Sequence, residues 1–233
     1  MKKREHNVAV VLAAGRGSRM QSAVQKQYLH IGERPVLYYS LKQFEDFDGV
    51  DEIILVTGEN EIEYCREEIV NTYNLKKVTS IIPGGIERYH SVYEGLCAAK
   101  ECDYVFIHDG ARPFLDRSIL ERVLEAVREY RACVVGMPVK DTIKIADGNQ
   151  FAVQTPDRSS LWMVQTPQVF EYGLIKDAYT RMMEAGIVGV TDDAMVLERM
   201  SGMQVKLVEG SYQNIKITTP EDLLVAEAFL KQA

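Results

Sequence analysis

A glycine-rich, basic stretch follows the first apolar run of the chain, Val8–Leu12. Glycines let a backbone turn sharply and bring its N–H groups close to an anion. The stretch carries Arg16 and Arg19, and Lys26 follows seven residues after Arg19. Positive charges gathered beside a glycine loop favour a site that neutralises a polyanion over a solvated turn with chance basic residues.

Two familiar phosphate-binding loops do not fit this stretch. The P-loop motif G-x-x-x-x-G-K-[ST] is absent, and Met20 stands where the dinucleotide fingerprint needs its third glycine. The second expected strand ends in Val56-Thr57-Gly58 rather than in the acid that binds a ribose, although Glu59 is close. A nicotinamide-dependent reductase is therefore disfavoured.

An aspartate directly follows another apolar run. Asp109 comes after Tyr104–Ile107, at the carboxyl end of an expected strand, where ligand sites of α/β sheets lie. Magnesium is typically held by one or two carboxylates together with substrate phosphates. Asp109 is thus a candidate ligand for Mg²⁺ or for a nucleotide ribose, and the alternative is an aspartate that caps its loop. We expect His108 to be a packed or hydrogen-bonded histidine rather than a metal ligand.

Alternating strand-like and helix-like segments must position these residues. Short apolar runs predict buried parallel strands, and apolar residues spaced three and four apart predict helices between them. This alternation predicts an α/β fold, a Rossmann-like doubly wound and mostly parallel sheet. The expected strands are 8–12, 53–56, 78–82, 104–107, 133–137 and 205–208, and the expected helices are 35–44, 61–73, 92–99, 118–127, 174–183, one from 192, and 219–230.

The pattern changes after Pro138. Ile143 and Ile145 alternate with polar residues, and Asp147-Gly148 is a strong turn signal before Phe151. Residues 139–160 are therefore expected to form an inserted β-hairpin arm. With no linker or repeat visible, we expect residues 1–233 to form a single domain.

Composition narrows the class of protein. The chain has 233 residues, 27 Lys and Arg, 34 Asp and Glu, and a net charge of −7. An acidic chain argues against general binding to nucleic acid or to an anionic membrane, and no run approaches the length of a membrane span. The four cysteines show no C-x-x-C spacing, which is typical of free thiols in a reducing compartment, so we expect a cytoplasmic protein.

Seven motifs occur in an order that resembles one enzyme family. They are Leu12-Ala-Ala-Gly-x-Gly-x-Arg-Met20 with Lys26-Gln-Tyr28, His108-Asp-Gly-Ala-Arg-Pro113, Asp141-Thr142, Asp157-Arg158, Gln165-Thr-Pro-Gln168, Thr191-Asp192 and Asn214-Ile-Lys-Ile-Thr218. Together they resemble nucleotidyltransferases that activate polyol phosphates, in particular the 2-C-methyl-D-erythritol 4-phosphate cytidylyltransferases of the non-mevalonate isoprenoid pathway. One position departs from the family pattern, because Gln25 stands where a proline is usual.

The resemblance implies CTP and 2-C-methyl-D-erythritol 4-phosphate as substrates, Mg²⁺ as cofactor and a homodimer whose arms cross. It implies catalytic roles for Arg19, Lys26 and Lys216, while Arg16 is left open. The expected nucleotide-binding residues are Ala13, Ala14, Gly15, Gly17, Gly84, Gly85, Ser91, Asp109 and Gly110. Arg112, Thr142, Arg158 and Thr191 are the expected contacts of the second substrate.

Several of these residues have structural alternatives. The alternatives are an outward-facing lysine of a strand for Lys216, a structural ion pair for Arg112, and the N-cap of the following helix for Thr191. Gly84 and Gly85 fit an ordinary turn as well as a base-binding loop.

The implied reaction is attack of a substrate phosphate on the α-phosphorus of CTP. It needs no general base, because a phosphate monoester is already ionised near neutral pH. The alternative activities are a ribitol 5-phosphate cytidylyltransferase and a nucleotide-binding module without turnover.

Overall fold

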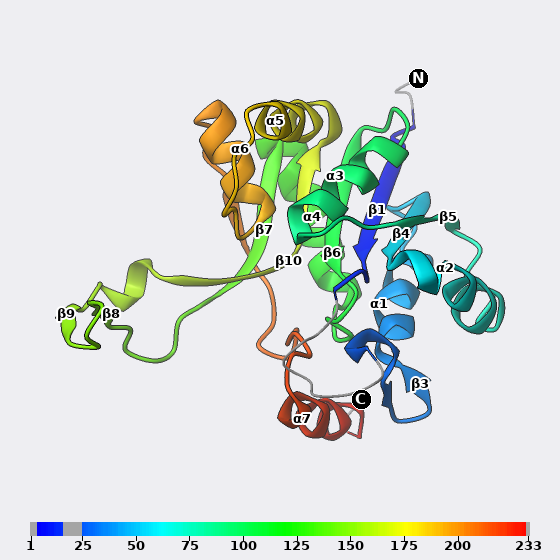
Figure 1. Cartoon of the computed structure of the whole chain (residues 1–233), viewed down its shortest axis with the longest axis horizontal. Helices are drawn as coiled ribbons and strands as arrows, with labels where there is room; N and C mark the ends of the chain where they lie inside the picture. Colours follow the sequence, from blue (N-terminus) through cyan, green and yellow to red (C-terminus); the bar gives the residue numbers. More distant parts are fainter. Residues whose placement is uncertain (1–3, 16–24, 232–233) are drawn as a thin grey trace.

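The computed structural model describes residues 4–15 and 25–231, and its centre is a seven-stranded sheet (Figure 1). In spatial order the strands are β11 (Lys206–Glu209), β7 (Ala132–Pro138), β10 (Trp162–Glu171), β6 (Tyr104–Asp109), β1 (Asn7–Leu12), β4 (Glu52–Thr57) and β5 (Val78–Pro83). Neighbouring strands are parallel, except that β10 is antiparallel to both β6 and β7. The strand order reverses beside β1, and sheets of this kind bind ligands beyond their carboxyl ends at that point.

Helices cover both faces of the sheet, so its inner strands are buried on both sides. Val8 and Val10 pack toward one face, whereas Ala9 and Val11 pack toward the other. This explains the continuous apolar runs, since neither face of an inner strand meets water. One layer contains α1 (Val36–Glu45), α4 (Arg117–Tyr130), α2 (Ile62–Tyr64) and the π-helix η4 (Cys65–Asn71), and the other contains α3 (Arg88–Ala98), α5 (Tyr172–Glu184) and α6 (Asp193–Ser201).

The predicted doubly wound α/β fold is confirmed, with two local differences. The helix expected over 61–73 is a composite of the 3₁₀ turn η3 (Glu59–Glu61), α2 and η4. The sequence reading also missed β10, the one antiparallel strand of the sheet. Its interior contains Pro167, which removes a backbone donor and argues against a central strand. The pairing accommodates the proline by a register shift between Val164 and Gln168.

The predicted hairpin is present and projects from the body of the molecule (Figure 1). Its antiparallel strands β8 (Ile145–Ala146) and β9 (Ala152–Gln154) flank the turn at Asp147, whose backbone N–H donates to the Phe151 carbonyl over 2.9 Å. The 3₁₀ turn η5 (Arg158–Ser160) leads the chain back to the sheet.

A smaller apolar cluster lies below the main sheet, where Ile31 and Val36 pack against Ile217 and Ala226. It seats the C-terminal helix α7 (Pro220–Leu230) beside the short hairpin of β2 (His30–Ile31) and β3 (Arg34–Pro35), which follows the 3₁₀ turn η2 (Lys26–Tyr28). This packing anchors the segment that carries Lys216, and the Ile217 N–H also donates to the Ala111 carbonyl, just after β6, over 2.8 Å. Among the described residues, no helix is long and apolar enough to cross a bilayer.

Candidate active site

Two adjoining pockets open at the carboxyl ends of the inner strands. The larger has a volume of about 440 Å³. It is lined by Leu12, Ala13, Ala14, Gly15, Lys26, Gln27, Gly85, Ile86, Glu87, Arg88, Ser91, Asp109, Ala111 and Lys216. Its position at the reversal of strand order is the one expected for a ligand site in this architecture.

The smaller pocket has a volume of about 290 Å³ and shares part of its wall with the larger one. Its lining residues are Arg88, Asp109, Arg112, Val164, Gln165, Thr166, Gln168, Thr191, Asp192 and Lys216. Of the described residues, Arg88, Asp109 and Lys216 are the ones that line both pockets. A group transferred between ligands in the two pockets would therefore pass these three side chains.

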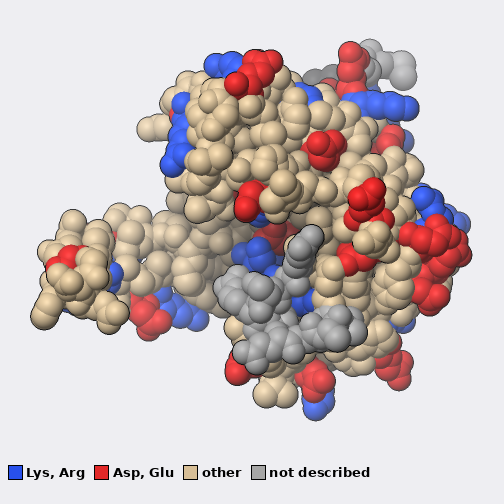
Figure 2. All heavy atoms as spheres, in the orientation of Figure 1, with Lys and Arg blue, Asp and Glu red and all other residues tan. Residues whose placement is uncertain are grey.

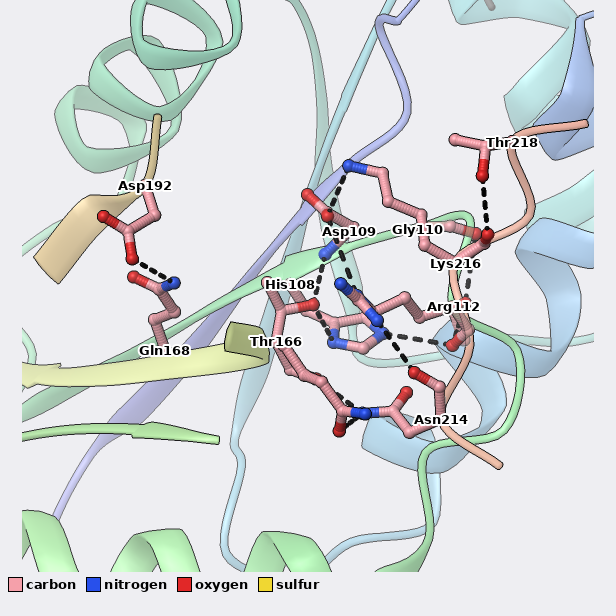
Figure 3. Close-up of polar contacts among 12 residues, drawn as sticks. His108, Asp109, Gly110, Arg112, Thr166, Gln168, Asp192, Asn214, Lys216 and Thr218 are labelled. Atoms are coloured by element: carbon pink, nitrogen blue, oxygen red, sulfur yellow. Dashed lines mark hydrogen bonds and ion pairs between the residues drawn. The ribbon is translucent and has the colours of Figure 1, made fainter. Parts of the chain in front are cut away.

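Asp109 is surrounded by cations (Figure 3). Lys216 Nζ donates to Oδ2 over 2.7 Å, and Arg88 Nε donates to Oδ1 over 3.1 Å. Arg112 Nε lies 3.8 Å from Oδ2. Burial by itself would raise the pKa of Asp109, but the three cations outweigh it and hold that pKa well below its usual range. The carboxylate is thus ionised throughout the neutral pH range.

A buried histidine supports the backbone of Asp109 (Figure 3). The Asp109 N–H donates to Thr166 Oγ1 over 3.0 Å, and that hydroxyl lies 3.0 Å from His108 Nδ1. His108 Nε2 lies 3.3 Å from the Arg112 carbonyl, which can act only as a hydrogen-bond acceptor. Nε2 therefore carries the ring proton, and Nδ1 accepts from Thr166. His108 is a neutral, hydrogen-bonded histidine, as the sequence analysis expected.

Acid should destabilise the fold through this histidine. Burial lowers the pKa of His108 from 6.5 to about 4. Between these two pKa values, the histidine is protonated in the unfolded chain but not in the folded chain. The free energy of unfolding therefore falls as the pH drops through this window. We expect the wild type to lose about 2 kcal/mol more than His108→Gln between pH 7 and pH 4.5.

Urea unfolding of both proteins at the two pH values measures this difference. The contribution of Asp109 begins to disappear only below its unfolded pKa of 3.8, so it does not account for a slope at higher pH. Equal losses in the two proteins would show that His108 is not the group that titrates.

Asn214 fixes the segment that carries Lys216. Its side chain is fully buried and donates through Nδ2 to the Thr166 carbonyl over 2.9 Å and to Gln165 Oε1 over 3.1 Å. Its own carbonyl accepts from Arg112 NH1 over 2.8 Å. Lys216, two residues later, therefore reaches the site from a fixed backbone and is not an outward-facing lysine of a strand.

Close backbone approach explains Gly84, which precedes Gly85 on the wall of the larger pocket but is not itself among the lining residues. A Cβ on Gly84 would come within 2.5 Å of the Ala14 Cβ and 2.6 Å of Ser91 Oγ. Gly85 lines the pocket, and its N–H donates to Ser91 Oγ over 3.1 Å. The loop after β5 thus lies directly against the loop after β1, and it is more than an isolated turn.

Gln27 holds the two ends of the glycine loop together. Its Nε2 donates to the Ala13 carbonyl over 2.5 Å and to the Gly15 carbonyl over 3.3 Å. Gln25, at the position where proline is usual in the family, donates to the carboxylate of Glu61. Lys26 lies between these two anchors and lines the larger pocket. The predicted residues Gly17 and Arg19, together with Arg16, lie outside the described residues.

The remaining predicted residues are spread between the site and the arm. Thr191 lines the smaller pocket, but the N-cap of α6 is Asp192, whose carboxylate accepts from the Met195 N–H over 3.0 Å. Thr142 and Arg158 are exposed in the 139–160 segment, where Arg158 NH1 donates to the Lys140 carbonyl over 2.9 Å.

Gly110 is not among the residues that line either pocket. Its N–H donates to the Leu12 carbonyl over 2.8 Å, and an added Cβ would lie 2.8 Å from Leu37 Cδ1. The structure therefore gives Gly110 a packing role between β6, β1 and α1.

Sequence reasoning missed Arg88 and Asp193. Arg88 NH1 and NH2 donate to the two carboxylate oxygens of Asp193 over 2.8 and 2.9 Å. A basic residue three positions after Gly85 was the only local signal for Arg88. Asp193 gave none beyond its place after Thr191-Asp192, because its partner is 105 residues away.

The site carries an excess of positive charge in an otherwise acidic chain. Figure 2 shows Lys and Arg side chains at the base of the central hollow, whereas Asp and Glu are spread over the outer surface. Among the described residues, the two pockets are lined by the cations Lys26, Arg88, Arg112 and Lys216 and by the carboxylates Glu87, Asp109 and Asp192, so the cations exceed the anions by one. Such a site suits polyanionic ligands.

Comparisons with known proteins agree over nearly the whole chain. Residues 7–232 match the family model of 2-C-methyl-D-erythritol 4-phosphate cytidylyltransferase. A curated protein of that name from Lachnospira eligens is 53% identical over 97% of this chain and 99% of its own length. Another from Caldanaerobacter subterraneus subsp. tengcongensis is 51% identical over 96% of this chain and 98% of its own length.

Solved structures agree with the sequence comparisons. A 4-diphosphocytidyl-2C-methyl-D-erythritol synthase from Anaerococcus prevotii superposes with a TM-score of 0.86 at 34% identity, covering 97% of this chain and 96% of its own. A 2-C-methyl-D-erythritol 4-phosphate cytidylyltransferase from Thermus thermophilus superposes with a TM-score of 0.78 at 31% identity, covering 97% of this chain and 99% of its own.

Proposed function

The chain belongs to the family of 2-C-methyl-D-erythritol 4-phosphate cytidylyltransferases, and on that premise we propose that its two pockets divide the substrates between them. The chain joins CTP to 2-C-methyl-D-erythritol 4-phosphate, giving 4-diphosphocytidyl-2-C-methyl-D-erythritol and pyrophosphate. The larger pocket takes CTP, and the smaller pocket takes the polyol phosphate. The observation that carries this division is the wall of Arg88, Asp109 and Lys216 common to both pockets.

The chemistry is a displacement at phosphorus. A phosphate oxygen of the acceptor forms a bond to the α-phosphorus of CTP, and the bond from that phosphorus to the bridging oxygen breaks. The electron pair leaves with pyrophosphate. Because the attacking phosphate is already ionised, the protein positions two anions and stabilises the charge that grows between them. The cationic site supports this role.

In the larger pocket, Gly85 and Ser91 would face the base, and Lys26 would clamp the triphosphate. Backbone groups of Ala13, Ala14 and Gly15 would hold the phosphates from the other side, in agreement with their place on the wall. Gly17 and Arg19 remain predicted members of the same set. Lys216, from the opposite wall, would approach the α-phosphate.

In the smaller pocket, Arg112 would hold the acceptor. Its side chain is only 12% exposed, and its Nε has no hydrogen-bond partner among the described residues. A buried donor without a partner is costly, so an anionic ligand there would satisfy it. Thr191, beside the N-terminus of α6, would contribute a hydroxyl to the same ligand.

Magnesium fits the site as an ion that arrives with the nucleotide. Within residues 4–15 and 25–231, no three His, Cys, Asp or Glu side chains gather to hold a metal by themselves. Asp109 supplies one carboxylate on the pocket wall, and Mg²⁺ commonly combines one carboxylate with substrate phosphates. When bound, the ion would neutralise phosphate charge.

The arm supports a homodimer, with residues 139–160 as the dimerisation element of a single-domain subunit. The apolar side chains of Phe151 and Val153 are 71% and 62% exposed, and those of Ile143 and Ile145 are 40% and 45% exposed. Exposed apolar side chains on a projecting hairpin are typical of a surface that binds a partner. The arm of a second copy would also bring Thr142 and Arg158 to the neighbouring acceptor pocket.

Phe151→Asp should therefore shift the protein from dimer to monomer. A charge replaces an apolar side chain that two subunits would bury together, and light scattering after size exclusion measures the mass. Val188→Asp is the control, because Val188 is 70% exposed but lies outside the arm. A Phe151→Asp variant that remains dimeric at micromolar concentration would contradict the assignment of the arm.

The compartment is inferred from the thiols. Cys65, Cys97, Cys102 and Cys133 are all unpaired. Burial raises the pKa of the Cys133 thiol to about 12, which keeps it protonated and inert. Free thiols of this kind support a reducing compartment, the cytoplasm.

The function is tested by pyrophosphate release with CTP and Mg²⁺. We would offer 2-C-methyl-D-erythritol 4-phosphate and ribitol 5-phosphate in parallel. Release with the former alone is the expected result. Release with the latter alone would keep the CTP pocket and overturn the acceptor, and CTP binding without release on either acceptor would identify a module without turnover.

A further inference from the structure

An ion pair outside the proposed substrate contacts joins the two halves of the site. Arg88 NH1 and NH2 bind both carboxylate oxygens of Asp193 over 2.8 and 2.9 Å, while Nε binds Asp109 Oδ1 over 3.1 Å. One guanidinium thus holds two carboxylates in a fixed geometry. A bidentate arginine pair of this kind defines orientation as well as charge.

Asp193 cannot act on a substrate directly. It is fully buried and is not among the residues that line either pocket. Tyr179 donates its hydroxyl to Oδ1 over 2.6 Å, and Gln168 Oε1 accepts from the Asp193 N–H over 3.0 Å. The contacts of the Asp193 carboxylate are Arg88 and Tyr179, and of these two only Arg88 lines the pockets, so the Asp193 side chain acts on the site through Arg88.

The pair connects elements that serve different ligands. Arg88 is the first residue of α3, directly after the loop beside the larger pocket, and Asp193 is the first residue of α6, beside Thr191 in the smaller pocket. Arg88 itself lines both pockets. A change in the Arg88–Asp193 pair would therefore alter the wall where the two ligands meet.

We propose that Arg88, held in place by Asp193, is a positioning residue that sets the orientation of the Asp109 carboxylate. Arg88 fixes Oδ1 and Lys216 fixes Oδ2 over 2.7 Å, so the carboxylate cannot rotate. Without Arg88, Lys216 and Arg112 remain and pull from the Oδ2 side alone. The carboxylate then turns and takes the Lys216 ammonium with it. The proposal rests on the proposed function.

The test compares Arg88→Met, Asp193→Asn and the double variant. Each single variant leaves a buried charge without its partner and should lower the Tm, whereas the double variant removes both charges and should recover most of it. We expect kcat to stay about tenfold or more below wild type in all three. The Kd for CTP, measured by calorimetry, should change by less than about threefold, because Lys26, Gly85 and Ser91 are untouched.

Two further variants separate orientation from charge and from general loss of an ion pair. Arg88→Lys keeps the charge, but one ammonium cannot reproduce the bidentate grip, so its kcat should remain low. The double variant Arg131→Met with Glu171→Gln removes a well-formed pair of 2.7 Å on the surface. This control should keep wild-type kinetics.

Three outcomes would overturn the proposal. Wild-type kcat in the double variant would make the pair purely structural, and a Kd for CTP that rises in parallel with the loss of kcat would make Arg88 a nucleotide ligand. The third outcome is structural and does not depend on a measurement of turnover. A crystal structure of the double variant should show a changed Asp109 rotamer, and an unchanged Asp109–Lys216 contact contradicts the proposal. A wild type that releases no pyrophosphate contradicts the proposed function instead.

Discussion

Lys216→Met is expected to lower kcat on the order of 100- to 1,000-fold. The Lys216 ammonium lies on the wall shared by both pockets, 2.7 Å from Asp109 Oδ2, where the transferred phosphoryl group would pass. Charge on that group grows in the transition state, so the loss should be larger in kcat than in the KM of either substrate. Methionine keeps most of the length of the side chain and removes its charge and its N–H donors.

Steady-state kinetics with varied CTP and varied acceptor provide the measurement. The fold should survive, because Asp109 keeps its bond to Arg88 and the backbone at Asn214 is anchored independently. Lys206→Met is the matched control, since Lys206 lies exposed on the edge strand β11. A Lys216→Met enzyme with kcat within threefold of wild type would remove Lys216 from the reaction.

Asp109→Asn is expected to lower both stability and activity. Asparagine preserves the shape of a side chain that is only 10% exposed. Within the described part of the chain, it leaves the three surrounding cations with one ion-paired carboxylate, that of Asp193. Removing one partner of a buried ion pair typically destabilises by about 3–5 kcal/mol. We expect a loss of about 3 kcal/mol in the free energy of unfolding and a fall in kcat on the order of 1,000-fold.

Urea unfolding at pH 7 and a Mg²⁺ titration of the rate measure the two effects separately. If Asp109 is a metal ligand, the Mg²⁺ concentration for half-maximal rate should rise by about tenfold or more. An unchanged value would assign the ion to the substrate phosphates alone. Asp48→Asn is the control for the chemical change, because the Asp48 side chain is 91% exposed and makes only a 3.4 Å contact with Arg117.

The cluster around Asp109 also explains how an acidic chain can bind two anions. In it, the cations Arg88, Arg112 and Lys216 face the two carboxylates of Asp109 and Asp193, so one positive charge is left over. The remaining positive charge faces the pockets. The negative charge of the whole chain therefore argues against nucleic acid as a general partner but not against a polyphosphate.

The sequence alone determined the sheet that carries the site. Runs such as Val8–Leu12 and Tyr104–Ile107 are apolar on both faces, and only a strand covered on both sides needs that pattern. The positions of Asp109 and of the glycine loop followed, because parallel strands present their carboxyl ends at one edge. The hairpin arm could also be predicted from the sequence, since alternation of apolar residues and an Asp-Gly turn are local signals.

Only the tertiary structure showed which distant residues pair with one another. β10 was missed because its polar residues and Pro167 fit a loop when they are read locally, although Thr166 and Gln168 are buried in hydrogen bonds with distant residues. The N-cap of α6 moved from Thr191 to Asp192 because cap geometry depends on the backbone of the preceding turn.

The pairing of Arg88 with Asp193 and Asp109 joins residues that are 105 and 21 positions apart. No local propensity encodes such an interaction. Ion pairs and hydrogen bonds between distant residues form only after the apolar strands and helices have packed, so a single sequence specifies the scaffold more directly than it specifies the contacts that orient its catalytic groups.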